Sequence, residues 1–234
     1  MKFNVLLEDL ALGELGGTSA IETGSYKISE ANLPKLIQII NRSLEHFYSM
    51  FYLKENTVII QLRNGISHYY LNSEFAESNH DSTKTKFIKD NALFPFNDDI
   101  IQIIEIADLN GNSIAINDIY AQYGVMLPQP NCVHVPRDLG ISELSIVYQA
   151  AHQRIPLTEP ADSVFEIGIP IPMVSAFMAY IACLWLHNVG GNSHQESNAF
   201  FAKYQTQIQM LKQQGIGVKQ YTGINIKPYL RGFI

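Results

Sequence analysis

Apolar residues recur every three or four positions in four stretches of the chain, and this spacing predicts four helices. The stretches are residues 3–12, 30–54, 173–186 and 193–213. Glycines follow the first stretch at positions 13, 16 and 17 and the last at 215 and 217, where they are expected to end the helices. Only a few residues separate the third and fourth stretches, so these two helices are predicted to form an antiparallel hairpin.

Between residues 57 and 165 the pattern changes to short runs of β-branched and aromatic residues. The runs at 57–62, 67–71, 100–107, 113–116, 132–135 and 144–151 are predicted strands. Asn64-Gly65 between the first two runs predicts a hairpin, because both residues tolerate positive φ. Asn110-Gly111 predicts a second hairpin turn, of type I′.

Together these patterns predict an α+β chain that is mainly helical. Residues 1–56 and 166–218 are expected to form an antiparallel helical bundle, and residues 57–165 a β-rich insertion. Residues 219–234 are predicted to be an extended C-terminal tail. The tail is too apolar for an ordinary solvated terminus, so it is expected to dock, and a neighbouring protein is the preferred surface because the preceding helical hairpin is already complete.

Residues 167–195 contain no Asp, Glu, Lys or Arg and therefore raise the question of a membrane span. Prolines 170 and 172 and the sequence His187-Asn188 bound the helical part. Fourteen helical residues cover roughly 21 Å, short of the ~30 Å hydrocarbon core. The sequence favours a buried core or interface helix and no membrane partner.

The composition limits the classes of partner. The net charge is −6 and only 16% of residues are charged, which argues against sequence-independent binding of a nucleic-acid backbone. With 47% hydrophobic residues, two readings stay open: a surface partly hidden against partners, or a polar surface rich in Asn, Gln and Ser. The two distant cysteines, Cys132 and Cys183, suggest neither disulfides nor a zinc site, and they fit folding in a reducing compartment.

No pattern of catalytic, metal-binding or cofactor-binding residues stands out. Asp108 to Asn112 lacks the glutamate that a calcium loop needs, and the seven histidines form no metal-binding or triad motif. No cofactor is expected, and the chain is predicted not to be an enzyme. Lys84, Lys86 and Lys89 form a small basic cluster whose expected state is a solvated surface.

Three places in the chain resemble the head-to-tail adaptor, or connector, proteins of short-tailed bacteriophages. The opening Leu6-Leu7-Glu8-Asp9-Leu10-Ala11-Leu12-Gly13-Glu14-Leu15 is similar to the family's short first helix closed by Gly-Glu-Leu. The helix after Pro34, ending in Phe47-Tyr48-Ser49-Met50-Phe51-Tyr52-Leu53-Lys54-Glu55, resembles the next element. The small-residue-rich helix 174–186 with the helix through Lys212 resembles the pair that builds the ring. The central β region is similar only in kind.

The resemblance implies a structural virion protein that forms a twelve-subunit ring between portal and tail, located in the virion neck and in the host cytoplasm during assembly. Genome DNA would pass through the ring without specific recognition, and the β insertion would meet tail nozzle or fibre proteins. The tail would bind the portal through Tyr221, Ile224, Ile226, Lys227, Tyr229, Leu230, Arg231, Phe233 and Ile234. The candidate subunit-interface residues are Phe177, Tyr180, Trp185, Phe200 and Tyr204.

Two alternatives remain open from the sequence. One is a different oligomeric binding module, bacterial or viral, which would not need the extended tail. The other is an enzyme with a site shared between subunits, with His134, His152 or the pair His187 and His194 as participants.

Overall fold

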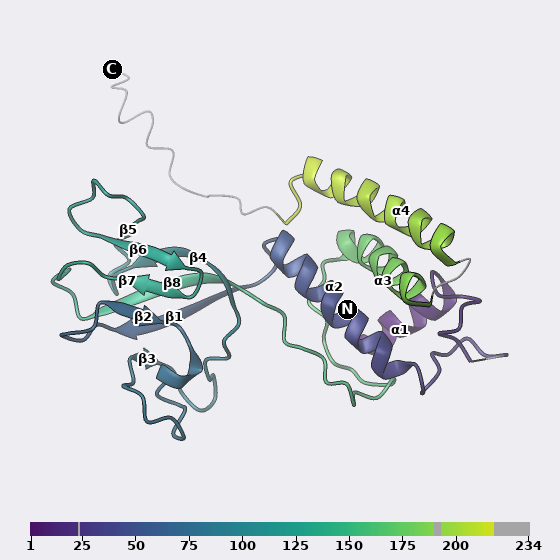
Figure 1. Ribbon diagram of the computed structural model, residues 1–234, viewed down its shortest axis with the longest axis horizontal. Coiled ribbons are helices and arrows are strands. Elements are labelled where there is room, and N and C mark those ends of the chain that lie inside the picture. The colour runs from purple at the N-terminus through teal and green to yellow at the C-terminus, as the bar shows by residue number, and fades with distance from the viewer. Residues whose placement is uncertain (23, 190–192, 218–234) are drawn as a thin grey trace, which may run out of the picture.

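The computed structural model describes residues 1–22, 24–189 and 193–217, which form a helical lobe and a β lobe (Figure 1). The helices are α1 (Phe3–Leu12), α2 (Leu33–Met50), α3 (Val174–Val189) and α4 (Ser193–Gln213), with 3₁₀ turns at Ser73–Phe75 and Ile171–Met173. The strands are β1 (Glu55–Gln61), β2 (His68–Tyr70), β3 (Ile88–Lys89), β4 (Ile100–Ala107), β5 (Ala115–Ile116), β6 (Gly124–Gln129), β7 (Cys132–His134) and β8 (Glu143–Ala150). The predicted tail, residues 219–234, lies outside the described residues.

The prediction of a mainly helical antiparallel bundle is wrong. The described residues hold four helices and two sheets of four strands each, at 33% helix and 22% strand. The helices were found at nearly their true positions, and α1 and α4 have the predicted bounds. The error lies in the β region, where β3 and β6 were missed. β3 has two residues in a Lys-rich loop, and β6 contains Gly124 and Pro128, residues that weaken a strand prediction.

The helical lobe is built around α3, which is apolar on most of its surface. α3 buries Phe177, Ile181 and Trp185 against α2 and α4, and an 18-residue window from Ile171 to Asn188 is apolar enough to cross a membrane by length and composition alone. Half of that window is buried inside the protein, as expected for the core helix of a lobe. At the other side of the lobe, the N–H of Phe3 donates to the carbonyl oxygen of Phe165 at 2.8 Å and fixes α1.

The β lobe consists of two sheets that share one hydrophobic core. The strand orders are β3-β1-β8-β4 and β2-β7-β6-β5, and all pairs are antiparallel except β5–β6. Ile60 and Ile146 of the first sheet lie in the same cluster as Tyr69 and Val133 of the second. The inward faces of both sheets therefore pack against each other as in a β sandwich.

The two predicted hairpins differ from what forms. β1 pairs with β3 and β8, whereas β2 pairs with β7, so the turn at Asn64-Gly65 carries the chain from one sheet to the other. Both edges of β1 are occupied, which leaves β2 no place beside it. At the second turn only Gly111 has a positive φ, and type I′ requires two such residues.

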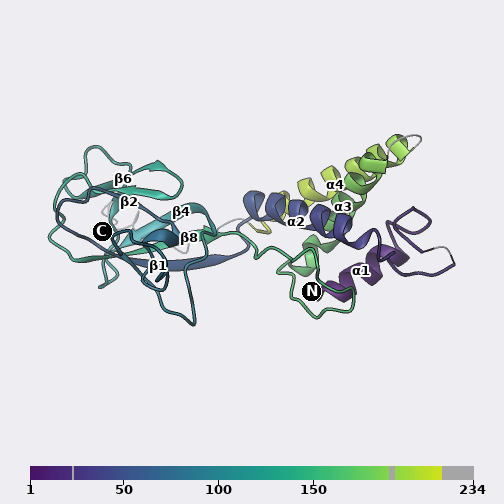
Figure 2. The ribbon, with the colours of Figure 1, turned by 60° about the horizontal axis from the view of Figure 1, so that its bottom comes forward.

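The lobes have separate hydrophobic cores and meet at a narrow junction (Figure 2). The β lobe begins at Glu55 and ends at Ala150. Ile155 and Phe165, which the sequence placed in the β insertion, pack in the helical core. The described chain ends at Gly217, whose carbonyl oxygen accepts a 2.8 Å hydrogen bond from the N–H of Tyr52 at the same junction.

Candidate interaction surfaces

The junction between the lobes is held by the buried side-chain amide of Gln149, at the end of β8. Its Nε2 donates to the carbonyl oxygen of Phe51 at 3.0 Å and to that of Tyr48. These carbonyls lie at and just beyond the C-terminal end of α2, where a helix leaves its last acceptors unpaired. A β-lobe side chain therefore completes the hydrogen bonding of a helix in the other lobe.

Asp99 gathers a second set of contacts at the junction. Its carboxylate accepts from Tyr148 Oη at 2.8 Å, Asn56 Nδ2 at 3.0 Å and Lys54 Nζ at 3.3 Å. Burial, with the hydrogen bond to Asp99, raises the pKa of Tyr148 above its usual value. Tyr148 therefore remains a neutral donor at physiological pH, and the carboxylate ties β1, β4 and β8 together where the chain enters and leaves the β lobe.

His152, named above as a possible participant in catalysis, is used for packing at this junction. Its Nε2 accepts a 3.3 Å hydrogen bond from the N–H of Gly168, and its ring meets Tyr48 edge to face at 5.2 Å. Burial lowers the pKa of its imidazole, although backbone contacts partly oppose this. A half-buried ring with both nitrogens in backbone contacts is poorly placed for proton transfer to a substrate.

The other candidate histidines occur in pairs. His187 and His194 lie edge to face, 5.5 Å apart, at the adjoining ends of α3 and α4. His134 stacks on His68 in the β lobe. Among the described residues, no group of three or more His, Cys, Asp or Glu side chains is arranged to hold a metal ion.

Three of the five candidate interface residues lie inside the chain's own core. Phe177, Trp185 and Tyr204 are almost fully enclosed, so their surface is not available to a neighbouring copy. Tyr180 and Phe200 are partly exposed. The sequence shows that these aromatics belong to one helical pair, but not which of them face inward.

An aromatic group joins the three helices that contain these residues. His46 Nε2 lies 2.7 Å from Tyr204 Oη, and the His46 ring stacks on Tyr180 at 4.8 Å. Burial lowers the pKa of His46, and burial with the neighbouring Tyr180 raises the pKa of Tyr204 to about 12. Neutral His46 and Tyr204 therefore join α2 to α4 by a hydrogen bond, and the partly exposed Tyr180 of α3 packs against the His46 ring.

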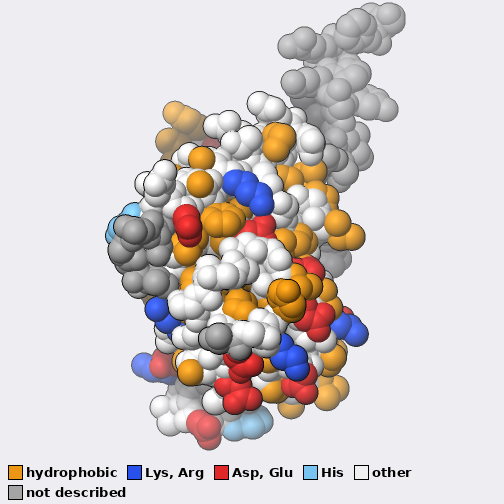
Figure 3. All heavy atoms as spheres, turned by 90° about the vertical axis from the view of Figure 1, so that its right-hand side faces the viewer, with side chains coloured by type: hydrophobic (Ala, Val, Ile, Leu, Met, Phe, Trp, Pro, Cys, Tyr) orange, Lys and Arg blue, Asp and Glu red, His pale blue; other side chains and the backbone are white. Residues whose placement is uncertain are grey.

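The outward side of α4 is exposed along the helix among the described residues. Its 21 residues carry only three ionisable Glu or Lys residues, and Phe201 and Met210 are 41% and 48% exposed. One of the charges, Lys203, is paired with Glu14 at 2.9 Å. Seen from the end of the helical lobe, hydrophobic side chains reach the surface among neutral and charged ones (Figure 3). Such a face resembles a protein interface more than a solvated helix.

The β lobe presents two apolar loops that hydrogen bonds hold in shape. In the first loop Ile119, Tyr120 and Tyr123 are 74%, 91% and 61% exposed. Asp118 Oδ1 accepts from the N–H of Tyr120 at 2.9 Å, and Asn117 Oδ1 accepts from the N–H of Leu127 at 2.8 Å. We call this loop, residues 117–123, the tyrosine loop.

In the second loop, Leu93 and Phe94 are 84% and 79% exposed. Asn91 Oδ1 accepts from both of their N–H groups, at 2.9 and 3.0 Å. Asp90 next to it accepts from Ser78 and Phe96. Burial opposes ionisation of Asp90, but the hydrogen bonds outweigh it and hold its pKa below the usual value. Large apolar side chains fixed in water are typical of a surface that is covered in an assembly.

Two of the three lysines in the predicted basic cluster make contacts within the β lobe. Lys86 Nζ donates to the carbonyl oxygens of Glu74 and Asn79, at 2.9 and 2.6 Å, and Lys89 pairs with Glu143. The proposed portal-binding residues and the basic residues Lys219, Lys227 and Arg231 lie outside the described residues.

The sequence did not single out the tyrosine loop or the loop at Leu93. The sequence does contain a pattern that indicates such loops. In Asn91-Ala92-Leu93-Phe94 and in Asp118-Ile119-Tyr120, large apolar residues lie in an Asx turn, and such turns lie at the protein surface.

No family model matches the chain, and no curated protein matches it either.

Proposed function

We propose that this chain is a structural subunit of a bacteriophage neck, which assembles into a ring between portal and tail and acts by binding. The observation that carries the proposal is the distribution of exposed apolar side chains. They lie on separate parts of the two lobes, on the outward side of α4 and on the two β-lobe loops. The sequence resemblance to head-to-tail adaptors supplies the identity of the assembly.

The physical argument concerns the number of faces. A subunit in a ring makes heterologous contacts and needs two different faces for its neighbours, besides those for proteins above and below. Large apolar residues scattered singly over a monomer are ordinary, whereas adjacent ones such as Ile119 with Tyr120 and Leu93 with Phe94 are typical of a surface that binds a partner. Several apolar faces on one small chain therefore favour an assembly with several contacts.

In this proposal each part has its own partner. The outward side of α4, with Tyr180 and Phe200, contributes to contacts between subunits. The tyrosine loop and the loop at Leu93 meet tail nozzle or fibre proteins. Residues 219–234 bind the portal. The acidic net charge suits a ring through which DNA passes without being held.

The test measures assembly directly. The purified chain is examined by light scattering and negative-stain imaging, alone and mixed with the portal protein encoded in the same genome. A ring, or a collar of chains on the portal, is the expected result. A monomer or dimer that binds no portal would overturn the proposal and leave the binding-module and shared-site alternatives.

A matched pair of variants assigns the faces. Phe201→Glu with Met210→Glu places two charges on the outward side of α4 and is expected to abolish the ring with little effect on thermal unfolding. Tyr120→Ser in the tyrosine loop is expected to leave the ring intact. The reverse pattern would show that the ring contact lies on the β lobe.

A further inference from the structure

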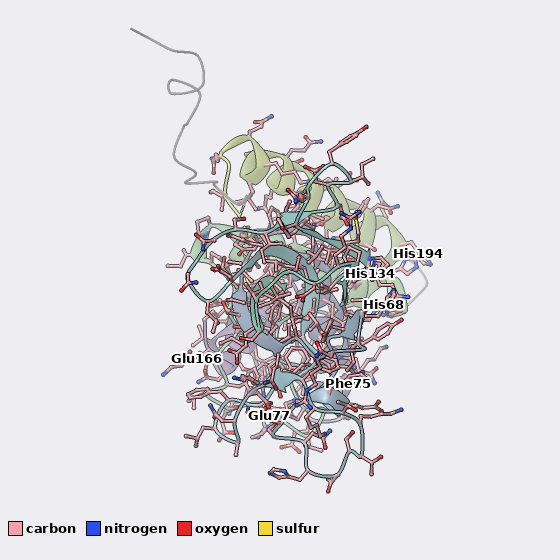
Figure 4. All side chains as sticks on the ribbon, turned by 90° about the vertical axis from the view of Figure 1, so that its left-hand side faces the viewer. His68, Phe75, Glu77, His134, Glu166 and His194 are labelled. Carbon is pink, nitrogen blue, oxygen red and sulfur yellow. The ribbon has the colours of Figure 1, made fainter. Side chains whose placement is uncertain are left out.

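His68 and His134 are direct partners across strands β2 and β7. Their rings are stacked, with centroids 4.2 Å apart and planes inclined by 15° (Figure 4). The next residues in the register, Tyr69 and Val133, are buried in the β-lobe core, so the two imidazoles lie on the opposite, outward face of the sheet. His68 is exposed and His134 partly exposed, which leaves the pair open to a ligand from solvent.

The spacing of the pair suits a shared metal ion. Four-coordinate ions hold imidazole nitrogens at about 2.0–2.1 Å, which sets two such nitrogens about 3.3 Å apart. Directly opposed residues of an antiparallel pair have Cβ atoms about 4.5–5.5 Å apart. The two rings, stacked at 4.2 Å without the ion, would turn about their side-chain torsions so that one nitrogen of each faces the same ion. Both side chains stand on strands, whose backbone is already ordered.

Ser67 orients one of the two ligands. Its Oγ lies 3.1 Å from His68 Nδ1. When Nδ1–H donates to this oxygen, Nε2 carries the free lone pair and is the ligand atom. A hydrogen bond to the other ring nitrogen is the usual support of a metal-binding histidine.

A third possible metal ligand lies on the same face of the sheet. Met126 of β6 is the register partner of His134, so its thioether is on the same outward face. Cys132, two residues before His134 on β7, also belongs to this face, but its side chain is fully buried and not open to solvent. The ligand set is therefore two imidazoles and a thioether, with water completing the coordination.

We propose that His68 and His134 form a binding site for a divalent first-row transition-metal ion, with Met126 as a weaker third ligand. Imidazole donors suit both Cu²⁺ and Zn²⁺, and Cu²⁺ is the tightest-binding ion of the divalent series, so it should bind more tightly than Zn²⁺. The ion would join the edge strand β2 to β7. This site is independent of the proposed assembly, and neither proposal depends on the other.

The test is calorimetric titration of the full chain, without an affinity tag, with Cu²⁺ in a weakly competing buffer and then with Zn²⁺. One tight equivalent of Cu²⁺ is expected, with Zn²⁺ weaker. His68→Ala and His134→Ala should each lower the affinity at least tenfold. His187→Ala is the matched control, because it removes one ring of the chain's other histidine pair. Unchanged binding in His68→Ala, or loss only in His187→Ala, would overturn the proposal.

Two further measurements cover the case in which the alanine variants unfold. Ser67→Ala keeps both rings and is expected to lower Cu²⁺ affinity about tenfold, the usual effect of losing an orienting partner. Electron paramagnetic resonance of the Cu²⁺-bound wild-type chain should show coupling to two imidazole nitrogens. Coupling to one or none would reject the paired site.

Discussion

The phenol oxygen of Tyr48 donates a 2.9 Å hydrogen bond to the carbonyl oxygen of Gly168, which joins α2 to the segment that leads into α3. Tyr48 is almost fully buried and also contacts the ring of His152, so its side chain cannot swing away. A Cβ atom on residue 168 would overlap the Tyr48 oxygen. The contact therefore requires glycine at this position for reasons of space.

Gly168→Ala is expected to lower the free energy of unfolding by about 1–3 kcal/mol, the usual cost of overpacking. Chemical denaturation measures the change. In a Tyr48→Phe background the phenol oxygen is absent, and the same substitution should cost much less. An equal loss of stability in both backgrounds would show that the effect of Gly168→Ala does not come from overlap with the Tyr48 oxygen.

Gln149→Leu tests the buried amide at the junction. It leaves the carbonyl oxygens of Tyr48 and Phe51 without the donor that they share, at an expected cost of about 1–3 kcal/mol in urea denaturation. Gln129→Leu, at an exposed strand position, is the control and should change stability by less than about 0.5 kcal/mol. Similar values for the two variants would contradict the role given to Gln149.

The pH dependence of stability should depend partly on His46. Burial lowers its pKa in the folded chain, so the unfolded chain binds a proton at higher pH. Stability is therefore full above about pH 6.5 and falls as the pH drops below that value towards the folded pKa. His152 has the same direction of shift and should add to the fall.

His46→Gln retains a group that can hydrogen-bond to Tyr204 but no longer titrates. The difference in unfolding midpoint between pH 7.5 and pH 5.5 should become smaller than in the wild type, with His152 supplying the remainder. Replacing the exposed His80 with Gln is the control. If His46→Gln keeps the full pH difference, the titration belongs to other groups.

Tyr120→Ser tests the tyrosine loop as a docking surface. Tyr120 is 91% exposed, so thermal stability should be unchanged, whereas binding to a tail nozzle or fibre protein should weaken at least tenfold. Tyr26→Ser removes an equally large side chain, 77% exposed, from the helical lobe and should bind as the wild type does. Equal binding of all three chains, measured by co-sedimentation, would exclude this loop as the contact.

Deleting residues 219–234 is expected to leave a folded protein that does not join its portal. Gly217, which contacts Tyr52, remains in this variant, so cooperative thermal unfolding should persist. A variant whose tail is replaced by a Gly/Ser sequence of equal length is the control. It shows whether portal binding depends on the side chains of the tail or only on its length. Loss of cooperative unfolding on deletion, or portal binding by the Gly/Ser chain, would refute the docking role of the tail.

The helices could be predicted from the sequence because their signal is local. The period of α2 and the glycines around α1 and α4 fix where a helix begins and ends without reference to the rest of the chain. Strand pairing is not local. The longer of β1's two pairings is with β8, more than eighty residues away in sequence, and the Asn64-Gly65 turn between β1 and β2 does not indicate it.

The candidate surfaces were less predictable than the helices, since sequence patterns do not separate buried from exposed aromatic residues. Trp185 and Tyr120 are both large and aromatic, yet Trp185 is buried in the helical core and Tyr120 is exposed to solvent. Likewise, the pairing of His68 with His134 depends on the register between β2 and β7, two strands that lie far apart along the chain. Only the assembled sheet reveals it.

Glu55 and Gln149 are register partners on neighbouring strands, so the chain enters and leaves the β lobe at nearly the same point. Residues 55–150 thus form a closed excursion that can be exchanged as one cassette. A graft that keeps Gln149 and its contacts with the end of α2 would retain the helical lobe while giving the protein a different set of binding loops.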